Sequence, residues 1–177
     1  MKNEVANPEE RHQFIIDLEK FLSGLNTEPK KEDIKNRQGI NYIPVSNIEA
    51  NLDRLFCGLW QTVNMNWQVV VNEIIVSIEL QVFHPIAKVW ITRTGVGAAQ
   101  IRQSSGASVS DIDKKIKNSM EMDMPHAKAD AIKNAAKSLG DLFGRNLSRK
   151  GADVTKYVPI LSSQIKKLAK KNERPQD

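Results

Sequence analysis

The sequence predicts an α+β fold in which a helix, a three-stranded antiparallel β-meander and a long helix form a β-β-β-α core. Apolar residues recur at every second position from Ile74 to Val82, which is the period of a strand with one buried face. Residues 125–147 are rich in Ala, Lys and Leu, which favour helix. The chain has 177 residues, of which 40% are hydrophobic and 27% charged, as expected for one domain with tails.

The first 33 residues predict an accessory helix followed by a linker. Asn7 is suited to the N-cap and Pro8 to the first helical position, and the acidic Glu9 and Glu10 follow. Apolar residues then recur at helical spacing until Leu25, where a polar run begins. We therefore place the start of the main domain at residue 34.

A second helix is expected over residues 46–59, because Ser46 and Glu49 have the spacing of a capping box. The three strands of the meander are expected at residues 67–71, 74–83 and 88–94, joined by short turns. Residues 95–124 contain three glycines and a Ser-rich stretch, which predicts a long, partly mobile connection.

Pro125 is expected to open the last helix of the core, which should end between residues 144 and 147. Its apolar side would pack on the sheet through Ile132, Ala135, Ala136, Leu139 and Phe143. Lys133 and Lys137 lie four residues apart on an exposed stripe, with Asn134 beside them. Two cations at this spacing can contact consecutive phosphates of a nucleic acid.

The net charge of +5 is concentrated at the C-terminus. Residues 145–177 carry nine basic and three acidic side chains, whereas the remainder is nearly balanced. We expect residues 34–150 to form the core domain and residues 151–177 a basic tail with a short amphipathic helix. Such a tail favours a polyanionic partner, nucleic acid before a membrane surface.

Several protein classes are disfavoured. Cys57 is the one cysteine and the three histidines lack the spacing of zinc ligands, so we expect neither a disulfide nor a metal site. The acidic residues are explained by solvated faces, and no nucleophile motif accompanies a histidine, so we expect no enzyme and no cofactor. The sequence contains no secretory or membrane-spanning apolar stretch, which predicts a cytoplasmic protein.

Three strings share their order with a known family. Ile34 to Arg37, followed by Tyr42 and Ile43, is similar to an arginine, a short spacer and Tyr-Ile before the first core helix. Residues 94–97 are similar to the glycine-containing end of a third strand. Residues 126–140 are similar to a last helix with an acid, an aliphatic, a basic pair, a further basic residue and a final glycine. Together the strings resemble the DNA-binding domain of the Rad-fifty-two family of single-strand annealing proteins, in a compact bacterial or phage form.

The resemblance implies a module that assembles into a homo-oligomeric ring and holds single-stranded DNA in an outer groove. The implied function is ATP-independent annealing of complementary strands in homologous recombination and DNA repair. By position in the motifs, the DNA-contacting residues are Arg37, Tyr42, Lys133 and Lys137, with Arg102 at a second, outer site. Asn134 occupies the position of the second basic residue of the pair, and Lys128 lies in the same string. We include both among the candidate DNA-binding residues. A single-strand-binding protein or an exonuclease is a further candidate partner.

Two other binding functions stay open. A double-stranded RNA-binding module has the same α-β-β-β-α order, with lysines on its last helix. A protein that coats single-stranded DNA ends without pairing them would need the same basic residues. Annealing and competition measurements separate the three.

Overall fold

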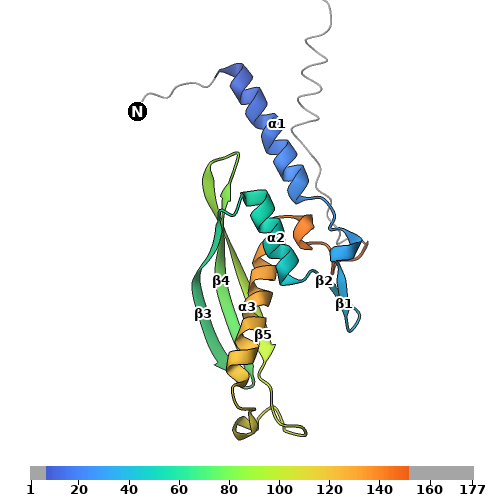
Figure 1. Ribbon diagram of the computed structural model, residues 1–177, viewed down its shortest axis with the longest axis vertical. Coiled ribbons are helices and arrows are strands. Elements are labelled where there is room, and N and C mark those ends of the chain that lie inside the picture. Colours follow the sequence, from blue (N-terminus) through green and yellow to red (C-terminus); the bar gives the residue numbers. More distant parts are fainter. Residues whose placement is uncertain (1–6, 152–177) are drawn as a thin grey trace, which may run out of the picture.

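The computed structural model describes residues 7–151 and has an α+β architecture. Its centre is a three-stranded antiparallel sheet of β3 (Trp60–Val70), β4 (Glu73–His84) and β5 (Val89–Gln100). The long helix α3 (Ser119–Lys137) packs across β4 and β5 (Figure 1). The expected combination of an N-terminal helix, an antiparallel meander and a long helix is confirmed.

The hydrophobic core lies between the sheet and the helices. In the central strand β4, the residues at even positions from Ile74 to Val82 are at most 1% exposed, and those at odd positions face the other side. The apolar residues expected on the last helix and after it are all buried in this core. Helix α2 (Val45–Phe56) closes the core with Ile48, Leu52 and Phe56.

Helix α1 (Pro8–Leu25) begins with the expected cap, since the Asn7 side chain accepts a hydrogen bond from the Glu9 amide. The helix projects past the end of the sheet, and its C-terminal part joins the body (Figure 1). The Phe21 ring lies 5.7 Å from the Phe56 ring and 4.6 Å from the His84 ring, between centroids. Burial lowers the pKa of His84, so the neutral imidazole is the form that packs here.

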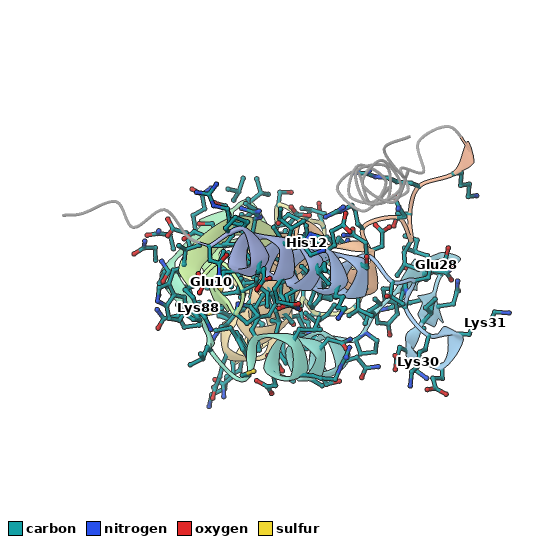
Figure 2. All side chains as sticks on the ribbon, turned by 90° about the horizontal axis from the view of Figure 1, so that it is seen from above. Glu10, His12, Glu28, Lys30, Lys31 and Lys88 are labelled. Atoms are coloured by element: carbon teal, nitrogen blue, oxygen red, sulfur yellow. The ribbon has the colours of Figure 1, made fainter. Side chains whose placement is uncertain are left out.

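A short hairpin of β1 (Lys35–Arg37) and β2 (Ile40–Tyr42) was not predicted. Its two turn residues, Gln38 and Gly39, have φ of 52° and 81°, the left-handed pair that joins two strands tightly. Figure 1 places the hairpin on the far side of α2 and α3 from the sheet. In the view from above, Glu28, Lys30 and Lys31 lie together at one side of the molecule (Figure 2).

Several element boundaries differ from the expected ones. Helix α2 starts at Val45 behind Pro44, with no side-chain cap, because Ser46 already lies inside the first turn. Strand β3 starts at Trp60 and β5 continues to Gln100, so both are longer than expected. Helix α3 starts at Ser119, which places Pro125 inside the helix. The helix ends at Lys137, and a short 3-10 helix follows at Asp141–Phe143.

The connection between β5 and α3 therefore spans only residues 101–118, and hydrogen bonds hold it. The buried Asn72 side chain donates to the Ile101 carbonyl (3.0 Å) and to the Gln103 side chain (2.9 Å). Gln103 in turn donates to the Asp111 carbonyl (2.9 Å). These bonds tie the start of the segment to Asn72 and to its own middle, just before a 3-10 turn at Ile112–Lys114. The expected basic tail and its helix lie outside the described residues.

Candidate nucleic-acid interface

A cleft of about 190 Å³ lies between the β1–β2 hairpin, α3 and the segment after residue 141. Its floor is apolar and is formed by Ile43, Ile48, Phe143 and Leu147. Its rim is polar and is formed by Asn41, Tyr42, Asp130, Lys133, Asn134, Lys137 and Ser148. Four of the seven residues that the sequence analysis selected therefore share one cleft, although Tyr42 lies about 90 positions before Lys133 along the chain.

The hairpin positions Tyr42 through its own side-chain bonds. Asn36 donates from its amide to the side-chain oxygen of Asn41 (2.8 Å) and accepts from the Gly39 amide (3.1 Å). These bonds support a pairing of only three residues on each strand, which would be weak alone. Tyr42 is thereby held at the end of β2, where its ring faces α3.

Lys133 carries its charge at the centre of the rim. Its ammonium nitrogen lies 5.5 Å from the centroid of the Tyr42 ring, within the range of a cation–π contact. The same nitrogen forms an ion pair with Asp130, one helical turn earlier. The Lys133 side chain is 22% exposed and that of Asp130 is 44% exposed, so the cation is the more enclosed partner.

Lys137 is held by the helix and by the sheet edge. Its ammonium group donates to the Asn134 side-chain oxygen (3.1 Å), and the Asn134 amide donates to the carbonyl of Val96 in β5 (2.8 Å). Burial, and then the charge of Lys133, lower the pKa of Lys137, while Asp130 opposes them. A cation that is partly removed from water gains more from an incoming anion than an exposed lysine does.

Glycine in β5 allows α3 to approach close enough for the Asn134 contact. A Cβ atom on Gly95 would collide with the Ala131 carbonyl and lie 2.7 Å from the Ala135 nitrogen. A Cβ atom on Gly97 would collide with the Ala127 carbonyl. The glycines thus let helix and strand backbones touch, with alanines on the helical side.

The remaining three selected residues lie outside the cleft. Arg37 is exposed on β1 next to the hairpin turn. Lys128 precedes Lys133 by five residues, which turns it about 140° around α3, and it is half-buried. Arg102 forms an ion pair of 2.8 Å with Asp123, whose carboxylate also accepts from the Arg102 amide (2.9 Å). Because the Asp123 side chain is only 4% exposed, Arg102 already neutralises a buried charge.

Arg102 also lines a second, more open hollow of about 420 Å³ beside the 101–118 connection. This hollow is lined mainly by uncharged residues, including Gln100, Gln103 and Ser104. The two hollows share no lining residue. A site at Arg102 would therefore be separate from the cleft, and the second, outer DNA site stays a prediction.

Sequence reasoning missed three polar residues in or near the cleft. Asp130 could have been found from its spacing to Lys133, which is that of a helical ion pair. Arg145 donates to the carbonyls of Lys137 (3.3 Å) and Ser138 (3.1 Å) and to the Asn26 side chain (3.2 Å), so it caps α3 and ties α1 to it. Asn41 carried no sequence signal, because its role depends on the hairpin.

Two kinds of feature are absent from residues 7–151. No helix in this range is long and apolar enough to cross a membrane. No group of three or more His, Cys, Asp or Glu side chains there is arranged to hold a metal ion.

Comparison with known proteins does not assign the chain to a family. No protein-family model matches it, and no curated protein matches it significantly. The assignment of function therefore depends on the cleft and on the resemblance described above.

Proposed function

We propose that the protein binds single-stranded DNA and anneals complementary strands without ATP, in homologous recombination and DNA repair. The observation that carries this proposal is the shared cleft of Tyr42, Lys133, Asn134 and Lys137. Lysines four residues apart on a helix match successive phosphates, and an aromatic ring beside them can contact a sugar or a base. Annealing makes and breaks no covalent bond, so these groups suffice without a cofactor.

The cleft suits the backbone of a single strand better than a duplex. Its volume is only about 190 Å³, with an apolar floor under a polar rim, whereas a duplex-binding module needs lysines spread across a groove of phosphates. In this arrangement the lysines hold the backbone and the base edges stay free to pair. We accordingly propose single-stranded DNA as the partner and the cytoplasm as the place of action.

The exposed edge of β3 supports self-association into a homo-oligomer. Within the described residues, β3 is hydrogen-bonded to β4 on one side only, and its bulge between Val63 and Asn66 interrupts the register. Large apolar side chains are exposed along and after it, at Met65, Trp67, Val69, Val70 and Val71. An unpaired edge with exposed apolar residues is suited to addition of another chain. We propose another copy of this protein, assembled into a ring.

An annealing assay without nucleotide tests the function. Complementary labelled oligonucleotides are mixed with the purified protein, and the rate of pairing is followed by energy transfer. We expect acceleration over the spontaneous rate, and preference for single-stranded DNA over duplex RNA in a competition titration. Tight binding without acceleration would instead indicate a protein that coats single strands, and preference for duplex RNA would overturn the proposal.

A further inference from the structure

Asp130 is the one acidic residue among those that line the cleft in the described part of the chain. Its carboxylate pairs with the Lys133 ammonium at 2.5 Å. The Asp130 side chain is 44% exposed, so water and solutes reach this ion pair from the cleft. One of the two cations of the proposed phosphate site is thus already engaged by an anion of the protein.

The same carboxylate also acts on the second cation. Lys133 disfavours the charged form of Lys137, and Asp130 favours it. One acidic group therefore serves two neighbouring ammonium groups in the free cleft. A carboxylate and a phosphate both present anionic oxygens that accept hydrogen bonds from ammonium groups. A phosphate at Lys133 would take over the hydrogen bond that Asp130 accepts and would be repelled by its charge.

We propose that Asp130 is a built-in competitor for DNA phosphate. Its carboxylate occupies Lys133 in the free protein and gives way when a phosphate of a single strand enters the cleft. This inference rests on the proposed function, because it names a determinant of affinity in the same site.

The competition sets how firmly each subunit holds the strand. The cleft gives up the Asp130–Lys133 ion pair when Lys133 contacts a phosphate, so the net gain at this lysine is small. A polymer engaged by many such clefts is still bound tightly through multivalency. Individual segments can nevertheless leave and return quickly, which a strand needs when it shifts register to find its complement.

Substitution of Asp130 by the isosteric asparagine tests the competition. Asp130→Asn removes the negative charge and keeps the shape, and Asp113→Asn is the matched control. Asp113 is exposed in the 101–118 connection, does not line the cleft, and its substitution changes the net charge equally. Binding of a fluorescent oligothymidylate is titrated at one salt concentration by anisotropy. We expect Asp130→Asn to bind about fivefold more tightly than Asp113→Asn, and to release the strand more slowly.

A double-mutant cycle tests the route through Lys133. If Asp130 competes at this lysine, most of the gain from Asp130→Asn disappears in a Lys133→Ala background. A gain of the same size in both backgrounds would mean that only net charge matters, and would overturn the inference.

The outcomes separate this inference from the proposed function. If the wild type binds the oligonucleotide and Asp130→Asn matches Asp113→Asn, the function stands and the competition is wrong. If the wild type fails to bind and Asp130→Asn binds, the Asp130 carboxylate blocks the site in the wild type, which supports the competition. If neither protein binds, both proposals are wrong.

Discussion

The ammonium group of Lys137 donates a hydrogen bond of 3.1 Å to the side-chain oxygen of Asn134. Asn134 is itself fixed by its bond to the Val96 carbonyl at the edge of β5. The position of a cleft cation is thus set by the sheet through one amide side chain. Asn134 is a positioning residue. It carries no charge, and its two hydrogen bonds fix the Lys137 ammonium group relative to the sheet.

Replacing Asn134 by alanine should weaken DNA binding without removing a phosphate contact. Lys137 would lose its anchor and the Val96 carbonyl its partner, and we expect a loss of affinity of about three- to tenfold. The slope of log affinity against log salt should stay unchanged, because no charge is lost. Salt-titrated anisotropy checks both values, and a slope reduced as much as in Lys137→Ala would show that Asn134 does not act through position.

The double variant Lys133→Ala with Lys137→Ala should lose two phosphate contacts. For a single strand, each contact contributes about 0.7 to the salt slope, so the slope should fall by about 1.4 and annealing should slow. The control is Lys20→Ala with Lys88→Asn, which removes two exposed lysines on α1 and in the β4–β5 turn. Asparagine suits the positive φ of 56° at position 88. An equal effect of both variants would assign binding to overall charge rather than to the cleft.

DNA binding should decline at a lower alkaline pH than exposed lysines would cause. Burial and then Lys133 lower the pKa of Lys137, so this group loses its proton at a lower pH than an ordinary lysine does. The folded protein binds fewer protons than the unfolded chain between the lowered pKa and the ordinary one. Burial of the Lys137 charge therefore lowers the free energy of unfolding at pH values below this window. The free energy of unfolding recovers as the pH rises through the window. In Lys137→Arg the early decline should vanish, since arginine stays charged. An unchanged pH profile in this variant would assign the decline to other groups.

The regular parts of the fold could be predicted from the sequence, whereas several boundaries could not. The alternation from Ile74 to Val82 identified β4 because the strand has one buried face. Strand β3 was only partly found, because Asn64 takes φ of 51° at the bulge and interrupts the two-residue period. Gly95 and Gly97 suggested a strand end, yet they lie inside β5, where the helix backbone leaves no room for a side chain.

The candidate site was predicted in part for similar reasons. Spacing along one helix revealed Lys133 and Lys137, and the resemblance supplied Tyr42, which the structure brings to the same cleft. Position in a motif does not report contacts between distant segments. Arg102 is engaged by the buried Asp123, 21 residues later, and this contact left no pattern in the sequence.

Gly95→Ala should strongly destabilise the fold. The added methyl group would collide with the backbone of α3 at Ala131, and neither backbone can move without disturbing the core. We expect a loss of about 3 kcal/mol or more in the free energy of unfolding. Gly24→Ala is the control, because nothing lies within 4 Å of its Cβ position in α1. That substitution should stabilise by about 0.5–1 kcal/mol. Urea denaturation measures both, and equal effects would show that the helix–strand approach is looser than described.

Self-association should depend on the edge of β3. The two edges of the sheet differ, because side chains of Arg93 and Asn134 already occupy the carbonyls of Thr92 and Val96 on β5. On β3, Val69 is 39% exposed beside the exposed Trp67. A lysine at an edge strand opposes pairing with another strand, so Val69→Lys should lower the assembly mass.

The matched control for the edge variant is Val109→Lys, because Val109 is 53% exposed and lies in the 101–118 connection. Sedimentation velocity at equal protein concentration compares both variants with the wild type. In a ring, the β3 edge of one copy meets a different surface of the next, so blocking one edge interrupts every interface at once. We therefore expect a shift from a large assembly to small species for Val69→Lys alone. A wild type that sediments as a monomer across micromolar concentrations would contradict the assembly, and an intact assembly in Val69→Lys would move the interface away from β3.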